Sequence, residues 1–252
     1  MKLFDLTGRT ALVTGSSRGI GRSIAGALAE AGARVAVHAS RESELLHQTV
    51  TELRASGATA EAFAANLADS TATKLLLSRI REGLGETDIL VLNASMQTYQ
   101  TLDDFTEEEF LREMAVNVQS SFSLIRDAVG PMKTQGWGRI LAIGSVNQWK
   151  PSPRLPIYAA TKAAQANLIV SCAKQYASFG ITANNLAPGV IPTDRNREAM
   201  GEKATVQRLL AAIPAGRFGT VEECAALALL LCSDAGAYIN GADIPVTGGM
   251  HL

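Results

Sequence analysis

The stretch "RTALVTGSSRGIGRSIAGALAEAGA" (residues 9–33) begins with an apolar run typical of a buried strand and continues as a helical pattern that ends near Gly32. Between the two lie Gly15, Gly19 and Gly21, which allow the backbone to turn sharply and to approach a ligand closely. The exposed N–H groups at the helix start favour an anion such as a pyrophosphate. The spacing is G-x-x-x-G-x-G, not the common dinucleotide fingerprint G-x-G-x-x-G, so a plain strand-to-helix turn is the alternative interpretation.

Outside this stretch, short apolar runs continue to alternate with longer helical patterns. Six further strands are predicted at residues 34–40, 59–67, 88–95, 138–145, 181–189 and 242–249. Helices are predicted at residues 43–57, 73–85, 106–133 and 158–179. Such alternation indicates right-handed crossovers and a parallel sheet covered on both faces. We therefore expect an α/β protein with a single-domain Rossmann fold over residues 1–252, a doubly wound parallel seven-stranded sheet flanked by helices.

Composition excludes several classes of function. The chain has 252 residues, 47% of them hydrophobic, and its 23 basic and 24 acidic residues leave a net charge of −1, unlike a nucleic-acid-binding protein. Cys172, Cys224 and Cys232 lack metal-ligand spacing, so we expect no metal site, and their odd number suits a reducing compartment. The N-terminus does not resemble a signal peptide, and no apolar run approaches the ~20 residues that span a bilayer. We expect a cytoplasmic protein with no membrane partner.

The end of the second predicted strand indicates which dinucleotide would bind. A carboxylate at this point holds the ribose 2′-hydroxyl of NAD, whereas an arginine accommodates the 2′-phosphate of NADP. The strand ends in His38-Ala39-Ser40-Arg41, without a carboxylate, and Arg18 lies inside the glycine loop. Arg18 and Arg41 could flank a phosphate that Ser40 also bonds. Arg41 could instead be a solvated residue at a helix start. NADP(H) is favoured, and NAD(H) remains possible.

Ser145, Tyr158 and Lys162 have the chemistry of a proton-transfer site. Tyr158 and Lys162 are four residues apart, so they share one face of a helix. A tyrosine is a poor acid or base at neutral pH unless a nearby cation favours the phenolate, and the lysine supplies that cation. Ser145 ends a predicted strand, and ligands of parallel α/β sheets bind beyond the carboxyl ends of the strands. Tyr-x-x-x-Lys alone is a weak signal; with the glycine loop and the serine it becomes specific.

Over nearly its full length the chain resembles the short-chain dehydrogenase/reductase family. The resemblance is carried by "TGSSRGIG" (14–21), "NAS" (93–95), Asn117 in "AVNV", Ser145, "YAATK" (158–162) and "PGVIPT" (188–193). It implies an NAD(P)(H)-dependent oxidoreductase that interconverts a secondary alcohol and a ketone. Tyr158 would be the general acid or base and Ser145 would hydrogen-bond the reacting oxygen. Lys162 would hold the nicotinamide ribose, and Asn117 would anchor a water in the proton relay.

The resemblance also implies a set of cofactor contacts. They are Gly15, Ser17, Arg18, Gly19, Ile20, Gly21, Ser40, Arg41, Asn66, Leu67, Asn93, Ala94, Tyr158, Lys162, Pro188, Gly189, Ile191 and Thr193. Two positions depart from the family pattern. Asn66 stands where an aspartate is usual, and Ser95 adds a side chain where the family usually has glycine. Asn93 could instead simply bridge strands.

The segments that should close the site are 96–100, 147–156 and a helical lid at about 190–217. Substrate would contact Ser145, Asn147, Trp149 and Tyr158, and the amides with the flat Trp149 ring suit a sugar, a polyol or another polar carbonyl compound. Trp149 could equally pack under the proline-rich loop. A 3-oxoacyl-ACP (thioester) reductase is an alternative function, and a non-catalytic dinucleotide sensor a more distant one.

The expected partners are copies of the same chain. Helices 106–133 and 158–179 carry broad apolar faces, and members of the resembled family typically pair these helices into dimers and often into tetramers. The last predicted strand and its tail resemble the part that often completes the tetramer. The sequence alone also permits a monomer in which these helices only cover the sheet.

Overall fold

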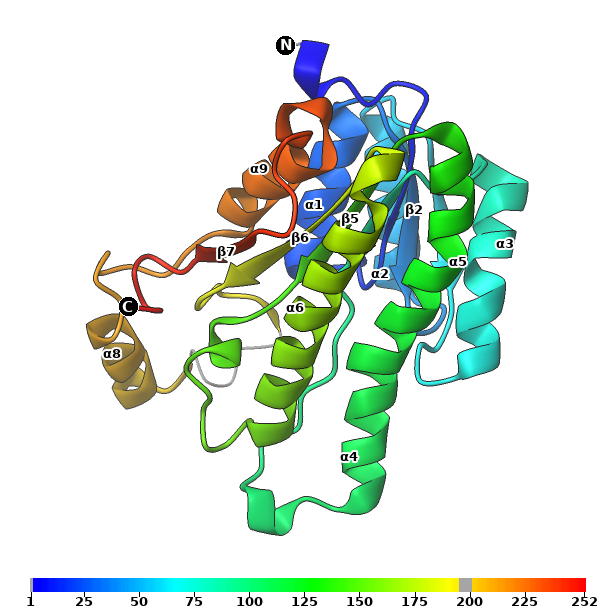
Figure 1. Ribbon diagram of the computed structural model, residues 1–252. Coiled ribbons are helices and arrows are strands. Elements are labelled where there is room, and N and C mark those ends of the chain that lie inside the picture. The colour runs from blue at the N-terminus through cyan, green and yellow to red at the C-terminus, as the bar shows by residue number, and fades with distance from the viewer. Residues whose placement is uncertain (1, 195–200) are drawn as a thin grey trace.

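The computed structural model describes residues 2–194 and 201–252, and a parallel sheet runs through the middle of this part of the chain (Figure 1). The sheet has the seven strands that the sequence predicts, and their order is β3-β2-β1-β4-β5-β6-β7. Their bounds are β1 Thr10–Val13, β2 Arg34–Ala39, β3 Ala60–Ala64, β4 Ile89–Leu92, β5 Gly138–Ile143, β6 Ile181–Pro188 and β7 Asp243–Val246. The strand order reverses between β1 and β4, where a doubly wound sheet opens a crevice at the carboxyl ends of its strands.

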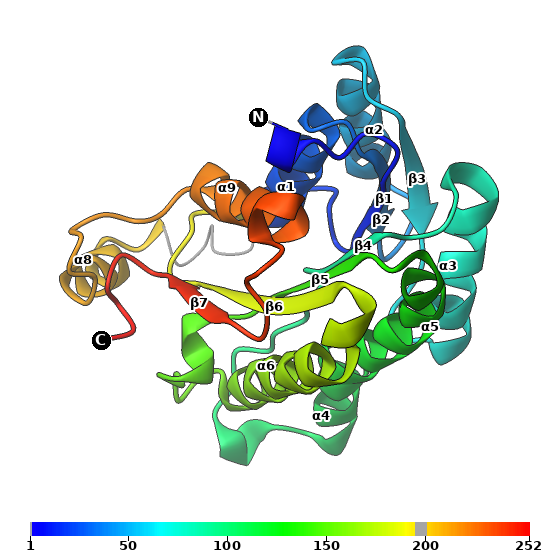
Figure 2. The same cartoon turned by 45° about the horizontal axis from the view of Figure 1, so that its top comes forward.

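Helices cover the sheet on both faces (Figure 2). One face carries α1 (Gly19–Glu30), α2 (Glu44–Ala55) and α9 (Val221–Cys232). The opposite face carries α3 (Ser70–Leu84), α5 (Ser120–Gln135) and α6 (Pro156–Tyr176). The expected α/β fold with helices on both faces is therefore confirmed.

The apolar strands build two cores at once. In β1 the side chains of Ala11 and Val13 enter the cluster that includes Ile24 of α1, while Leu12 enters the cluster that includes Ile80 of α3. Successive side chains of a strand point to opposite faces. A strand buried on both faces must therefore be apolar throughout, which explains the unbroken apolar runs in the sequence.

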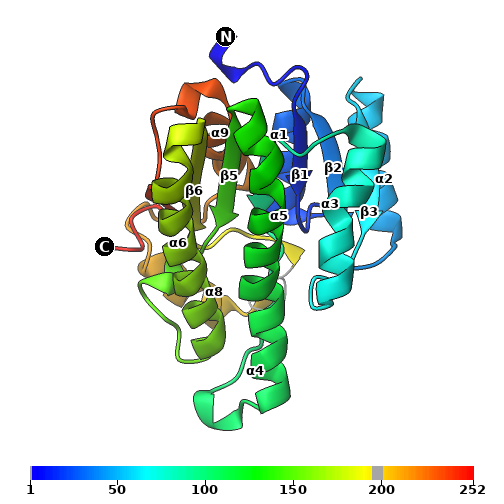
Figure 3. The ribbon, with the colours of Figure 1, turned by 45° about the vertical axis from the view of Figure 1, so that its right-hand side comes forward.

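The predicted helix at 106–133 is three consecutive segments. Helix α4 (Glu107–Met114) leads into a turn of π-helix at Ala115–Gln119, and α5 follows (Figure 3). A wider turn of this kind inside a helix is frequent at functional sites, and here it contains Asn117. Helical periodicity alone does not reveal such a turn, because the apolar positions continue across it.

Helix α9 is absent from the predicted elements. It begins with a capping box in which the Thr220 side chain accepts from the Glu223 N–H and the Glu223 carboxylate accepts from the Thr220 N–H. Its buried side chains include Cys224, Ala228 and Cys232, which pack in the same cluster as α1. The Thr-x-x-Glu pattern before an apolar run was the signal that could have predicted this helix.

The predicted lid falls partly outside the described residues, since residues 195–200 are not among them. In the described part, helix α8 (Lys203–Ala211) agrees with the helical pattern predicted there. No helix within residues 2–194 and 201–252 has both the length and the apolar character needed to cross a membrane.

Candidate active site

A pocket of about 710 Å³ lies where the glycine loop meets residues that follow β4, β5 and β6. Its wall includes twelve of the predicted cofactor residues: Gly15, Arg18, Gly19, Ile20, Gly21, Asn93, Tyr158, Lys162, Pro188, Gly189, Ile191 and Thr193. Ser145 and Asn147 line the same pocket. Residues separated by more than 170 positions in the sequence therefore meet at one site.

The glycine loop requires glycine at two positions. Gly15 has φ of +65°, and a Cβ there would lie 3.0 Å from the Ala94 Cα. A Cβ on Gly21 would lie 2.4 Å from the Asn93 Nδ2 and 2.5 Å from the Gly15 oxygen. Arg18, at the N-cap of α1, makes no side-chain cap. The first N–H groups of this 12-residue helix thus adjoin the pocket without a side-chain cap, which fits the phosphates of a dinucleotide.

His38 fixes the loop from behind and was not among the predicted site residues. The Gly15 N–H donates to its Nδ1 at 3.0 Å, so its Nε2 carries the proton and donates to the Ala65 carbonyl, also at 3.0 Å. The ring is 1% exposed, and burial lowers the pKa of His38 to about 4. His38 is therefore a neutral strut between the glycine loop and the end of β3.

Asn93 ties the end of β4 to the same loop. Its Nδ2 donates to the carbonyl oxygens of Thr14 (2.8 Å) and Gly15 (3.0 Å), while its backbone N–H donates to the Thr14 hydroxyl at 2.9 Å. Both amide hydrogens are thus used within the protein. This geometry matches the bridging interpretation of Asn93, although the residue also lines the pocket.

Ser145, Tyr158 and Lys162 come together at the other side of the pocket. Ser145 and Tyr158 are each 7% exposed, and Lys162 is 1% exposed. The Lys162 Nζ lies 5.8 Å from the centroid of the Tyr158 ring and donates to the Ile143 carbonyl at 2.6 Å. The Ser145 Oγ accepts from the backbone and side-chain nitrogens of Asn147 at 3.2 and 3.3 Å. A phenol, a hydroxyl and an ammonium thus adjoin one cavity.

Asn117 is fully buried and does not line the pocket. Its Oδ1 accepts from the Met96 N–H at 2.8 Å, and its Nδ2 donates to the Met96 carbonyl at 2.9 Å and to the Thr161 hydroxyl at 3.0 Å. Both amide hydrogens of Asn117 are therefore committed. The side chain joins the π-turn to the segment after β4 and to helix α6.

Six predicted cofactor residues lie outside the pocket wall: Ser17, Ser40, Arg41, Asn66, Leu67 and Ala94. Ser40 and Arg41 are exposed just after β2, and Asn66 is exposed after β3. Leu67 is 6% exposed and packs in the core under α3. Ala94 packs against the glycine loop, and its N–H donates to the Thr14 hydroxyl at 3.0 Å.

The structure separates the two predicted substrate residues of the 147–156 loop. Asn147 lines the pocket, whereas Trp149 does not; its ring centroid lies 6.0 Å from that of His251 near the end of the chain. Trp149 is 40% exposed at this position. Lining residues that were not predicted individually include Lys150, Ser152, Arg154, Leu155, Glu202, Thr205, Arg208 and Met250, and all of these except Met250 lie in segments predicted to close the site. Met250 had no local signal, because a fold-level contact brings the chain end to this wall.

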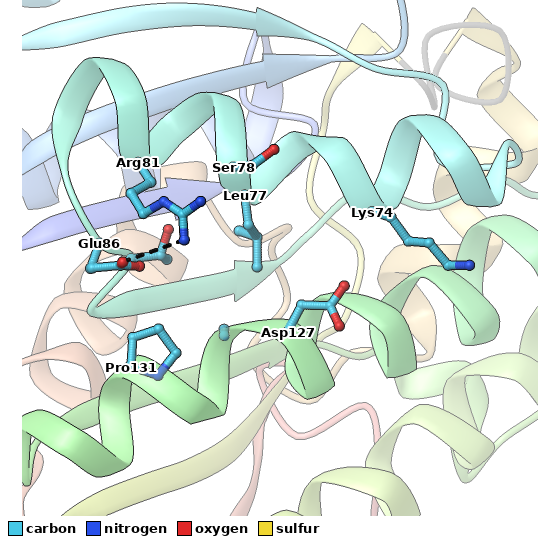
Figure 4. A pocket seen from close by; sticks show the side chains of 9 residues that line it. Lys74, Leu77, Ser78, Arg81, Glu86, Asp127 and Pro131 are labelled. Carbon is cyan, nitrogen blue, oxygen red and sulfur yellow. Dashed lines mark ion pairs between the residues drawn. The ribbon is translucent and has the colours of Figure 1, made fainter.

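A second, smaller hollow lies between α3 and α5 (Figure 4). Its volume is about 190 Å³, and Lys74, Arg81, Glu86 and Asp127 are among its lining residues. An ion pair of 3.8 Å joins Arg81 and Glu86 at one end of it. It contains no predicted site residue, so the larger pocket is the candidate active site.

Known proteins resemble this chain over almost its whole length. A family model described as enoyl-(acyl carrier protein) reductase matches residues 15–251. The 3-oxoacyl-[acyl-carrier-protein] reductase of Escherichia coli (strain K12) is 38% identical over 248 residues, which cover 98% of this chain and 99% of that protein.

Two solved structures are similar in both sequence and fold. A 3-oxoacyl (acyl-carrier-protein) reductase from Agrobacterium tumefaciens C58 with NADP bound is 40% identical, with a TM-score of 0.93 over 98% of this chain and 96% of that one. A gluconate 5-dehydrogenase from Burkholderia cenocepacia J2315 in complex with NADP and tartrate is 35% identical, with a TM-score of 0.93 over 98% and 97%.

Proposed function

The chain belongs to the short-chain dehydrogenase/reductase family, and from this membership and the pocket we propose that it interconverts a secondary alcohol and a ketone on a polar substrate, with NADP(H). The observation that carries the proposal is that Ser145, Tyr158 and Lys162 line one pocket with the glycine loop. That arrangement brings a proton donor and a hydrogen-bond donor to the place where a dinucleotide would lie. When bound, the cofactor supplies or accepts the hydride.

The protein's own residues provide the proton chemistry. In ketone reduction the Tyr158 hydroxyl donates a proton to the carbonyl oxygen, and in alcohol oxidation the Tyr158 oxygen takes it back. The Ser145 hydroxyl donates a hydrogen bond to the same oxygen and stabilises the charge that develops on it. The buried ammonium of Lys162 favours the phenolate form of Tyr158 and would hold the nicotinamide ribose of a bound cofactor. Asn117 would bind a water of the proton relay through its backbone, because both of its side-chain amide hydrogens are bonded to Met96 and Thr161.

NADP(H) is the better match of the two dinucleotides. No carboxylate follows β2 in Ala39-Ser40-Arg41, and Arg18 adjoins the pocket beside the start of α1. Two solved relatives also hold NADP. The remaining contacts implied by the family resemblance, at Ser17, Asn66, Leu67 and Ala94, are proposed as backbone or rim contacts.

A polar substrate, such as a sugar acid or polyol, suits the rest of the wall. Lys150, Arg154 and Arg208 line it together with Asp194 and Glu202, and Asn147 presents an amide. The described parts of the predicted lid, residues 190–194 and 201–217, would close this end of the pocket. The second candidate is a 3-oxoacyl thioester reductase, which the 38–40% identity to such enzymes favours.

Two measurements test the proposed function. Thermal unfolding with NADPH and with NADH should show the larger rise in Tm with NADPH, because a ligand that binds only the folded state stabilises it by mass action. Turnover is then measured with aldonates, neutral polyols and acetoacetyl thioesters. Stabilisation by NADH alone contradicts the cofactor assignment, and turnover of the thioester alone selects the second candidate.

We also propose a homodimer or homotetramer in the cytoplasm. Phe110 and Leu111 of α4 and Phe122 of α5 are large apolar side chains that are 40, 56 and 50% exposed. Pairing between subunits would bury them. The three cysteines are free and buried, which suits a reducing compartment. Sedimentation of the protein, compared with a Phe122→Glu variant, tests the assembly: a species of monomer mass in both samples contradicts it.

A further inference from the structure

A line of buried polar groups lies behind Lys162, and the mechanism above does not use it. The Lys162 Nζ donates to the Gln165 Oε1 at 3.1 Å, and the Gln165 Nε2 donates to the Ser121 Oγ at 2.9 Å. The Ser121 hydroxyl donates in turn to the Asn117 carbonyl oxygen at 2.9 Å. Gln165 is 1% and Ser121 2% exposed. The line joins two groups of the proposed proton relay without passing through the pocket.

The direction of every bond in this line follows from Lys162. An ammonium can only donate, so Gln165 must turn its carbonyl oxygen toward Lys162. Its NH₂ group then faces Ser121, whose oxygen must accept. The Ser121 proton is left to bond the Asn117 carbonyl. One orientation of the Gln165 amide therefore satisfies all three groups, and the reversed amide would place N–H groups against the ammonium.

We propose that Gln165 is a positioning residue that holds the Lys162 ammonium toward Tyr158 and ties it to the Asn117 turn; this rests on the proposed function of that site. Gln165 lies on α6 one turn after Lys162, whereas Ser121 begins α5 and Asn117 lies in the π-turn. The line thus crosses between neighbouring helices and fixes the ammonium relative to the turn.

The chemistry of the amide explains why a glutamine serves better here than a carboxylate. A neutral oxygen accepts a bond from the ammonium and leaves its positive charge acting on Tyr158. A glutamate at this position would accept the same bond and cancel much of that charge. An apolar residue would leave both Lys162 and Ser121 with one bond fewer in a buried place.

The test titrates Tyr158 in the whole protein without cofactor or substrate, so it is independent of whether the proposed substrate class is correct. Tyrosinate absorbance is followed against pH, and the curve of Tyr158→Phe is subtracted to isolate Tyr158. We expect the midpoint to rise by about one pH unit in both Gln165→Leu and Gln165→Glu. Gln175→Leu, on an exposed part of the same helix, is the matched control and should leave the midpoint unchanged.

Two results would overturn the proposal. One is an unchanged Tyr158 midpoint in both Gln165 variants, which would make Gln165 a structural residue only, if their Tm is lower. The other is an equal rise of the midpoint in the Gln175→Leu control. If Gln165→Leu does not fold, Ser121→Ala replaces it, because it releases the Gln165 amide and should raise the midpoint by a smaller amount. Failure of the proposed function would give a different result: the wild-type protein would turn over none of the aldonates, polyols and thioesters named above.

Discussion

Two buried cations lie at opposite ends of strand β5. Arg139, 3% exposed, lies near the start of β5, where its Nη2 is 2.9 Å from the Asp234 carboxylate and its Nε donates to the Ser233 carbonyl at 3.1 Å. Lys162, 1% exposed, donates to Ile143, the last residue of β5, and to the Gln165 amide oxygen. Arg139 therefore faces a carboxylate, whereas the Ile143 and Gln165 oxygens that accept from Lys162 are neutral.

This difference indicates that the Arg139 charge has a structural role, whereas the Lys162 charge takes part in the proposed chemistry. The Asp234 carboxylate cancels much of the Arg139 charge, so Arg139 serves to anchor the turn after α9 to β5. The Lys162 charge is not cancelled by these two acceptors, and its buried surroundings screen it weakly. It therefore acts on Tyr158, whose ring centroid lies 5.8 Å from the Lys162 Nζ. The ends of the strands also differ, because ligands of such sheets bind at the carboxyl end. We therefore expect mutations at the two ends to affect different properties.

The largest effect should come from the group on which the Lys162 charge acts. Tyr158→Phe removes the proton donor and should lower turnover by about 10³-fold or more, with little change in Tm or in stabilisation by NADPH. Tyr176→Phe, on the same helix and away from the pocket, is the control and should retain full turnover. Turnover in Tyr158→Phe above a tenth of the wild-type rate would show that Tyr158 is not the proton donor.

His38 is also buried at the carboxyl edge of the sheet, but it is neutral. Burial lowers its pKa to about 4 in the folded protein, below the ordinary value of 6.5, so the unfolded chain binds the extra proton between these values. Stability should therefore fall as the pH drops below 6.5, and His38 should contribute a loss of about 2 kcal/mol between pH 7 and pH 5.

Urea unfolding at both pH values measures this loss. A His38→Asn variant is less stable at pH 7, but it should lack the His38 share of the decline toward pH 5. An equal decline in the variant and the wild-type protein would show that His38 is not the group responsible.

A smaller effect is expected at the amino end of β5. Asp234→Asn keeps a hydrogen-bond acceptor for Arg139 and removes the negative charge, so the free energy of unfolding should fall by about 1 kcal/mol. Turnover should stay within two-fold of the wild-type rate. Urea unfolding and a turnover assay check the two halves, and a ten-fold loss of turnover in a folded variant would contradict the structural assignment of this end.

The sequence predicts the strands and the candidate site because both rest on local patterns. Apolar runs mark strands buried on two faces, and Tyr158 with Lys162 is readable from helical spacing alone. The order of alternating elements then predicts that Ser145 and the glycine loop share one edge of the sheet, and both line the pocket.

Other features depend on contacts that no local pattern contains. The π-turn around Asn117 is held by bonds to Met96 and Thr161. Gln165 has no distinguishing feature in the sequence, because its bond to Ser121 forms only when α5 and α6 pack together. Trp149 reads as a possible substrate wall, yet it packs near His251, which is 102 positions away. Such positions are determined by tertiary packing.

Lys162→Met and Arg139→Met, measured side by side for turnover per folded molecule and for Tm, show whether the two ends of β5 have different roles. We predict that Lys162→Met loses at least about 10²-fold in turnover, with the smaller change in Tm. Arg139→Met should lose several degrees in Tm and keep its turnover, since it gives up the bonds to Ser233 and Asp234. Equal losses of turnover in the two variants, or full turnover in Lys162→Met, would contradict a chemical role for Lys162 and a structural role for Arg139.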